Sequence, residues 1–222
     1  NAYRFSIYRF KKNIQTVYVY QMGNTMIDTG QSHSREEVLL HLKKSRIDQI
    51  VLTHFHEDHS GNAGYLSKKW NIPVYAHPIG VKILKSGSKM SPLGFLLNGS
   101  VDKFSAKPLL ENQVIDTGKL ILQPIYTPGH SQDHYSYYVK EKGWLLSGDL
   151  YVADKIKYFS DDTFTHKAHK NIYWDLEEFL STKKDSIILN CNQITFSELI
   201  QFLDNYQPEP EFKIDDIVVV ES

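Results

Sequence analysis

Thr53-His54-Phe55-His56-Glu57-Asp58-His59-Ser60-Gly61 is the most informative stretch of the chain, and it lies between a segment with strand character and a segment with helical spacing. Three imidazoles and a carboxylate within six residues are typical ligands of transition metals. In an extended backbone His54 and His56 project to the same side, and the turn into the helix brings Asp58 and His59 close to them. A polar loop that only caps a helix does not account for such a cluster. The stretch therefore predicts a metal site.

Two further segments carry residues of the same kind. Thr127-Pro128-Gly129-His130 and Ser147-Gly148-Asp149 each follow a predicted strand directly. Each segment places a ligand-type residue just beyond the end of a strand, as the 53–61 stretch does. Because loops at strand ends can direct side chains toward a common point, we expect all three segments to open onto one edge of a sheet.

The rest of the chain alternates between strand and helix patterns. Period-two alternation and apolar runs bounded by turn residues predict strands over residues 3–8, 16–21, 47–53, 73–76, 120–126, 135–139, 144–147 and 186–189, with another short strand ending at residue 28. Apolar stripes at helical spacing predict helices over residues 34–42, 63–70, 172–180 and 196–203. The weakly periodic stretch 77–118 is interpreted as short helices and long loops. No repeat or linker divides the chain, so we predict one α/β domain over residues 1–222.

Composition excludes several classes of protein. The 222 residues are 41% hydrophobic, with 25 Lys and Arg against 26 Asp and Glu, so neither disorder nor a nucleic-acid partner is expected. No apolar run approaches the ~20 residues of a membrane helix. Cys191 is the single cysteine and forbids an internal disulfide, which favours a cytoplasmic location, although a removed signal peptide stays open. The oligomeric state is not predicted.

In order along the chain, these motifs resemble those of the metallo-β-lactamase superfamily, in its glyoxalase II-like or lactonase-like group. The matching motifs are Ile27-Asp28-Thr29-Gly30, the 54–61 stretch, Thr127 to His130 and Ser147 to Asp149. The resemblance implies a four-layer αβ/βα sandwich with its metal site along one edge. It also implies zinc as the cofactor, as one or two Zn²⁺ ions, with Mn²⁺ or Fe²⁺ as alternatives.

The resemblance also gives each site residue a role. It implies that a first metal is bound by His54, His56 and His130, and that a second metal is bound by Asp58 and His59. The carboxylate of Asp149 would bridge the two metals, and Asp28 and His134 would support the site from outside.

The chain departs from the family pattern after strand 186–189, where the family's last histidine ligand is missing. The sequence there reads Asn190-Cys191-Asn192, with Asn192 nearest in register. A neutral amide is a poor zinc ligand. Cys191 could supply a thiolate, but a cysteine after a strand is more simply a small buried apolar residue. Either the second metal binds weakly, or the protein has lost catalysis.

The predicted chemistry is hydrolysis of an ester, thioester, lactone or amide in a small-molecule substrate. A metal held by neutral imidazoles generates hydroxide near neutral pH and polarises the substrate, and Asp58 is the candidate catalytic residue that orients the nucleophile and takes its proton. Asp149 argues against a β-lactamase, which carries Cys or Ser there. The 73 residues after Asp149 are fewer than hydroxyacylglutathione hydrolases carry. Segments 77–118 and 154–171 are expected to wall the pocket. The alternative is an inactive member that acts as a binding module.

Overall fold

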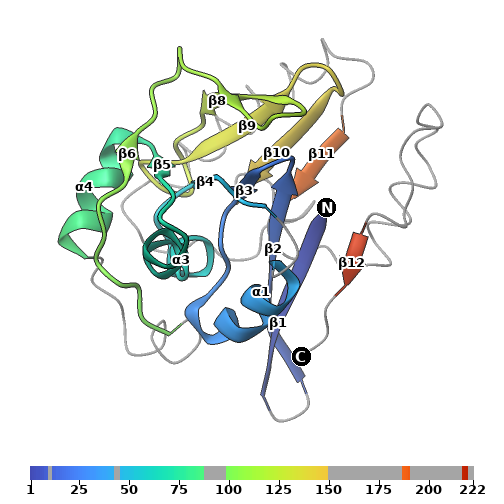
Figure 1. The fold of residues 1–222 in the computed structure, drawn as a ribbon, viewed down its shortest axis with the longest axis vertical. Coiled ribbons are helices and arrows are strands. Elements are labelled where there is room, and N and C mark those ends of the chain that lie inside the picture. Colours follow the sequence, from blue (N-terminus) through green and yellow to red (C-terminus); the bar gives the residue numbers. More distant parts are fainter. Residues whose placement is uncertain (10–11, 43–45, 88–98, 150–186, 191–216, 220–222) are drawn as a thin grey trace.

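The computed structural model describes residues 1–9, 12–42, 46–87, 99–149, 187–190 and 217–219 of the 222-residue chain. In this part of the chain two β-sheets pack together, and helices cover the far side of the larger one (Figure 1). The larger sheet has the strand order β12 (Ile217–Val219), β1 (Ala2–Arg9), β2 (Lys12–Met22), β3 (Thr25–Ile27), β4 (Gln49–Val51), β5 (Val74–Ala76) and β6 (Lys107–Pro108). The smaller sheet has the order β11 (Ile187–Asn190), β10 (Trp144–Gly148), β9 (Tyr135–Val139), β8 (Ile121–Tyr126) and β7 (Ile115–Asp116).

Pairing in the larger sheet changes from antiparallel to parallel along the chain. Strands β1, β2 and β3 pair antiparallel, as the alternating N-terminal sequence predicts. From β3 onward the pairs β3–β4, β4–β5 and β5–β6 are parallel, because each connection crosses over the outer face of the sheet. The carboxyl ends of β3, β4 and β5 therefore lie along the same edge of the sheet.

The central strands of the larger sheet are buried on both faces, and their side chains alternate between two cores. In β2, Val17 and Val19 pack with the helices, whereas Tyr18 and Tyr20 pack against the smaller sheet. The second of these two cores contains the inward residues of β8, β9 and β10, among them Leu122, Tyr137 and Leu146. Burial on both faces fixes the register of each strand, since a slip by one residue would exchange the two sets of side chains.

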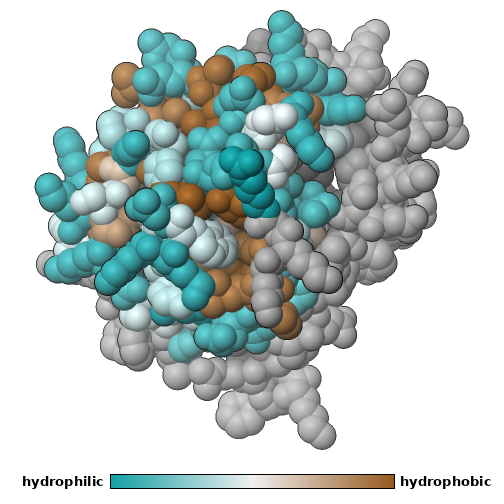
Figure 2. Space-filling model, viewed as in Figure 1, coloured by the Kyte–Doolittle hydropathy of each residue, from teal (hydrophilic) through white to brown (hydrophobic). Residues whose placement is uncertain are grey.

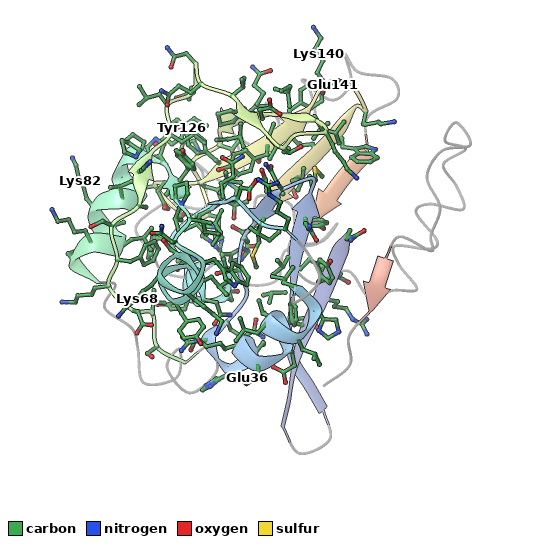
Figure 3. All side chains as sticks on the ribbon, viewed as in Figure 1. Glu36, Lys68, Lys82, Tyr126, Lys140 and Glu141 are labelled. Atoms are coloured by element: carbon green, nitrogen blue, oxygen red, sulfur yellow. The ribbon has the colours of Figure 1, made fainter. Side chains whose placement is uncertain are left out.

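Three helices form the layer outside the larger sheet. They are α1 (Arg35–Leu42), which follows a 3-10 turn at Ser32–Ser34, α3 (Ala63–Trp70) and α4 (Pro78–Ser86). Their apolar side chains enter the first core, notably Val38, Leu42, Leu66 and Leu84. Figure 3 shows charged residues on the outward faces of the same helices, Glu36, Lys68 and Lys82. Hydrophilic residues accordingly cover much of this side of the molecule, with smaller hydrophobic patches between them (Figure 2).

Most predicted elements that fall on described residues are confirmed. The strands at 120–126, 135–139, 144–147 and 186–189 match β8, β9, β10 and β11 within two residues. In the weakly periodic stretch 77–118, helix α4 agrees with the prediction, but the two-residue strands β6 and β7 were missed because so short a segment shows no period. The predicted helices at 172–180 and 196–203, which would form the fourth layer, lie outside the described residues.

No helix in the described part of the chain combines the length and the apolar character needed to cross a bilayer. The longest of those helices, α4, has nine residues.

Candidate metal centre

The predicted ligands and the supporting Asp28 come from four loops that meet at one edge of the two packed sheets. Asp28 follows β3, and His54 and His56 follow β4 just before the one-turn helix α2 (Glu57–Ser60). His130 lies between β8 and β9, and Asp149 follows β10. The structure therefore brings these four segments together, as the positions of the motifs at strand ends predict.

Three imidazoles form the first group. Nδ1 of His56 lies 3.0 Å from Nε2 of His54 and 2.8 Å from Nε2 of His130. Ligand atoms of all three residues lie within 4.8 Å of one another. The first two residues are two positions apart in sequence, whereas His130 comes from a loop of the smaller sheet, 74 residues after His56.

Asp149 connects this group to a second one. Its Oδ2 lies 3.4 Å from Nε2 of His130, and its Oδ1 lies 3.1 Å from Nε2 of His59. His54, His59 and Asp149 form the second cluster of potential ligand atoms, again within 4.8 Å of one another. Asp58 lies beside it, with Oδ2 3.7 Å from Nε2 of His59. Each carboxylate oxygen of Asp149 thus faces a different imidazole, the arrangement that a carboxylate shared by two metals requires.

Asp28 supports the centre from behind. Its side chain is fully buried and accepts three hydrogen bonds, from the main-chain N–H of Thr53 (2.7 Å), from the Thr53 hydroxyl (2.7 Å) and from Nδ1 of His59 (2.8 Å). The backbone of Asp28 has a φ of 57°, which Asp tolerates better than most residues. Because Nδ1 of His59 donates to Asp28, the ring is held with its Nε2 facing Oδ1 of Asp149 at 3.1 Å.

His134 ties two of the loops together. Its Nε2 accepts a hydrogen bond from the main-chain N–H of Asp149 (3.1 Å), so Nδ1 carries the proton and donates to Oγ1 of Thr127 (2.9 Å). Gly148 has a φ of 57° and packs against this ring, where a Cβ would collide with it. Since both nitrogens are engaged, His134 holds Asp149 in place in the structure.

Burial keeps most of these imidazoles neutral. It lowers the pKa of His54 and of His134 well below the usual value, and neighbouring imidazoles lower them further. The pKa of His130 falls to about 4, with burial as the main cause. Burial also lowers the pKa of His59, but the carboxylates of Asp149, Asp58 and Asp28 outweigh it and raise the pKa well above its usual value.

The donor set fits a divalent metal ion. Three imidazole nitrogens that converge, with two of the distances between them at 2.8 and 3.0 Å, form a donor set that a cation would bind. Since all three ligand atoms also lie within 4.8 Å of one another, His54, His56 and His130 would hold one such ion together. Carboxylates and imidazoles in the second cluster are acceptable to zinc, manganese and iron alike.

Some predicted residues cannot be placed. Cys191 and Asn192 lie outside the described residues, as does the segment 154–171. Strand β11 ends at Asn190, whose Cα is paired with that of Gly148, one residue before Asp149. The backbone that precedes the missing family ligand therefore reaches the same edge as the centre.

Several contributing residues were not predicted from the sequence. Asn62 donates to the main-chain carbonyls of Thr29 and Gln31, which fixes the loop after β3 against α2. The Thr53 and Thr127 hydroxyls orient histidines, and Asp133 is buried in the turn between β8 and β9. The sequence feature that could have pointed to these residues is that they lie within the motifs or close to them.

Two histidines outside the motifs are half-buried. His77 begins α4, accepting a hydrogen bond from the N–H of Ile79, and its ring stacks on Tyr126 at 4.6 Å; Figure 3 shows Tyr126 beside α4. The ring of His41 packs edge-on against the rings of Tyr3 and Phe5, with 6.3 Å between the ring centroids in each pair. These contacts come from strands far away in sequence, so local composition did not reveal them.

Two relatives of the chain carry the names of hydrolases. The chain is 37% identical over 102 residues to "Probable metallo-hydrolase YqgX" of Bacillus subtilis, covering 46% of this chain and 48% of that protein. It is 32% identical over 101 residues to a hydroxyacylglutathione hydrolase of Legionella pneumophila, covering 45% of this chain and 32% of that enzyme. The chain thus spans about half or less of the length of these two relatives.

Solved structures and a family model agree on the fold. The structure matches the BLEG-1 B3 metallo-β-lactamase with a TM-score of 0.65 at 22% identity, covering 90% of this chain and 97% of that one. It matches TTHA1623 in a di-iron-bound form with a TM-score of 0.63 at 22% identity, covering 89% and 97%. The model of the metallo-β-lactamase superfamily matches residues 12–188, which include every motif of the centre. Sequence and fold together show that the chain belongs to the metallo-β-lactamase superfamily.

Proposed function

We propose that the protein is a metal-dependent hydrolase that uses one or two zinc ions to cleave an ester, thioester, lactone or amide in a small molecule. One observation carries the proposal. Ring nitrogens of His54, His56 and His130 converge, and Asp149 places one carboxylate oxygen beside His130 and the other beside His59. This geometry suits metal chemistry better than a purely structural role, because buried imidazoles seldom face one another without a cation between them.

In the proposed centre the chain's own residues divide the work between them. A first metal would be held by His54, His56 and His130, and a second metal by Asp58 and His59. Asp149 would join the two metal sites, and Asp28 and His134 would support them from outside. When bound, the metal supplies a Lewis acid that polarises the substrate and lowers the pKa of water toward neutrality.

Asp58 is the proposed catalytic residue. Its carboxylate is 12% exposed and its Oδ2 lies 3.7 Å from Nε2 of His59, so it lies at the rim of the second cluster and remains accessible to water. A carboxylate in that position can orient the attacking water, accept its proton and pass that proton to the leaving group.

The relatives guide the choice of substrates and metals to test. Because one relative is named a hydroxyacylglutathione hydrolase, hydroxyacylglutathione belongs in the panel beside simpler thioesters. Because one structural match is described in a di-iron-bound form, iron belongs beside zinc and manganese.

A substrate panel tests the proposal directly. Metal-free protein is loaded with Zn²⁺, Mn²⁺ or Fe²⁺, and hydrolysis of chromogenic esters, thioesters, lactones, amides and hydroxyacylglutathione is followed by absorbance. We expect turnover of at least one class that depends on added metal, and its loss in His56→Ala, because that variant lacks the nitrogen between His54 and His130.

His33→Ala is the matched control, since His33 is exposed and lies outside both clusters. It should retain the activity of the wild type. Silence of the fully loaded protein across the whole panel would reject the hydrolase proposal and favour a binding module instead. Equal activity in His56→Ala would show that the cluster does not carry the reaction.

A further inference from the structure

Asp133 is a buried acidic residue that the centre described above does not use. The residue is 1% exposed, and its Oδ1 accepts a hydrogen bond from the Ser131 hydroxyl at 2.8 Å. Its Oδ2 is also buried, and it has no hydrogen-bond partner within the described part of the chain. Burying a carboxylate that is only half satisfied costs free energy, so its presence here calls for a physical reason.

The carboxylate lies between two segments that carry ligands. On one side is Ser131, directly after His130. On the other side, the main-chain N–H of Phe55 and the imidazole of His56 both favour the ionised form of Asp133. Burial raises the pKa of this carboxyl to about 6, and these neighbours work against that rise. The side chain of Asp133 thus interacts both with the segment that carries His56 and with the turn that carries His130.

Helix α4 leaves room for this carboxylate. Gly80 lies in the first turn of α4, and a Cβ there would collide with Oδ2 of Asp133. The backbone of Gly80 is not among the glycines with positive φ, so conformation alone does not require a glycine. An alanine would suit the helix better. The absence of a side chain at Gly80 is therefore explained by the space that Asp133 occupies.

We propose that Asp133 is a positioning residue of the metal centre. Its carboxylate accepts a hydrogen bond in the turn that carries His130 and interacts electrostatically with the segment that carries His56, so that the nitrogens of His56 and His130 converge before metal binds. The inference rests on the proposed function, since it takes these nitrogens to be metal ligands. Carboxylates that orient the ligands of a metal from outside typically change its affinity 10- to 100-fold, and we expect a loss in that range.

The first test compares Asp133→Asn with Asp116→Asn, an exposed control whose side chain only accepts from the N–H of Gly118. Zn²⁺ affinity is measured on metal-free protein by competition with a chromophoric chelator, and Co²⁺ is added to record the visible absorption of its site. We expect Asp133→Asn to bind Zn²⁺ about 10- to 100-fold more weakly and to show an altered Co²⁺ spectrum. Asp116→Asn should match the wild type in both.

Thermal unfolding of the metal-free proteins separates positioning from a purely structural role. A neutral amide is less costly to bury than a carboxylate, so Asp133→Asn should unfold at or above the wild-type temperature while its metal affinity falls. A lower unfolding temperature together with unchanged Zn²⁺ affinity and Co²⁺ spectrum would overturn the inference.

Gly80→Ala gives a second test that leaves Asp133 in place. The added methyl group displaces Oδ2, so Zn²⁺ affinity should fall in the wild-type background. The same change should have little further effect on Asp133→Ala, in which the space is free, and this non-additivity identifies the contact. If Gly80→Ala weakens binding equally in both backgrounds, the inference fails. A wild type that binds no metal would refute the proposed function itself, which keeps the two failures distinct.

Discussion

At the scale of single residues, the hydroxyl of Thr53 determines which nitrogen of His54 a metal can reach. Its one proton is donated to Oδ2 of Asp28 at 2.7 Å, so its oxygen accepts from Nδ1 of His54 at 3.0 Å. Nδ1 of His54 then carries the ring proton, and the lone pair lies on Nε2, which faces His56. A residue that touches no metal thereby sets the tautomer of one that does.

Replacing this hydroxyl should weaken the centre. Thr53→Val keeps the shape of the side chain but removes one of the three donors to Asp28 and the acceptor of Nδ1 of His54. We therefore expect a loss of about 1–3 kcal/mol in the free energy of unfolding and about a 10-fold loss in Zn²⁺ affinity. Urea denaturation of metal-free protein and chelator competition measure the two effects. Thr53→Ser, which keeps the hydroxyl, is the control, and a valine variant that binds Zn²⁺ as tightly as the serine variant would contradict the mechanism.

The sequence was informative about residues whose neighbours are close in the chain. His54, His56, Asp58 and His59 lie within six residues, so their spacing alone predicted a cluster. Asp133 was not predicted, because its partners lie on other loops and a single aspartate in a turn has no distinctive spacing. The same holds for Gly80, Thr127 and Asn62, whose roles depend on contacts between segments.

At the scale of elements, β9 fastens the smaller sheet to the end of β4. The Tyr137 hydroxyl donates to the carbonyl of Leu52 at 2.8 Å, and the main-chain N–H of Tyr135 donates to the carbonyl of Thr53 at 2.7 Å. Both acceptors directly precede His54. The position of that histidine relative to the smaller sheet is therefore set by two hydrogen bonds.

Removing one of these bonds should loosen the contact between the sheets. Tyr137 is fully buried, so Tyr137→Phe leaves a buried carbonyl without its donor, and we expect a loss of about 1–3 kcal/mol in the free energy of unfolding. In the control Tyr126→Phe, the lost bond to the carbonyl of Gln132 is exposed, so its change should stay within about 0.5 kcal/mol. If urea denaturation gives equal losses in the free energy of unfolding for Tyr137→Phe and Tyr126→Phe, the buried bond between the sheets contributes no more stability than the exposed one.

Strands were predictable where their apolar residues alternate with polar ones or form a continuous run. Strands β2, β8, β9 and β10 have alternating or continuous apolar runs, and the sequence located each of them within about four residues. Strands β6, β7 and β12 have two or three residues each and exist because a neighbouring strand pairs with them. Their existence is a property of the assembled sheet rather than of the local sequence.

At the scale of the whole molecule, the centre joins the two sheets. His54, His56 and His59 follow a strand of the larger sheet, whereas His130 and Asp149 follow strands of the smaller one. A metal held by both sets would act as a cross-link that exists only in the folded protein. Folding and metal binding should therefore be thermodynamically coupled.

Metal removal should lower stability. A metal that binds only the folded protein adds about 4 kcal/mol at a concentration 1,000 times its dissociation constant. We expect the unfolding temperature, followed by circular dichroism, to fall on treatment with a chelator and to recover with Zn²⁺ but not with Mg²⁺. In His56→Ala the shift should be much smaller. If the unfolding temperature of the wild type does not change when Zn²⁺ is removed or added, folding and metal binding are not coupled.

The order of the motifs predicted the fold family correctly, because three strand-end segments with ligand-type residues restrict the possible arrangements severely. The single domain over residues 1–222 and the outer helical layer on the smaller sheet stay predictions. So does the replacement of the last ligand by Cys191 or Asn192, since those residues fall outside the described part of the chain.

Strand β12 has a consequence for the order in which the chain is made. It pairs in parallel with β1, joining Ala2, Tyr3 and Arg4 to Ile217, Val218 and Val219. The other edge of β1 is already paired with β2. On the ribosome, residues 217–219 emerge long after β1 and β2, so the outer edge of β1 stays without this partner while the intervening chain is made. An open strand edge is a template for pairing with another chain. The nascent chain is thus exposed to aggregation at β1 until β12 arrives to cover it.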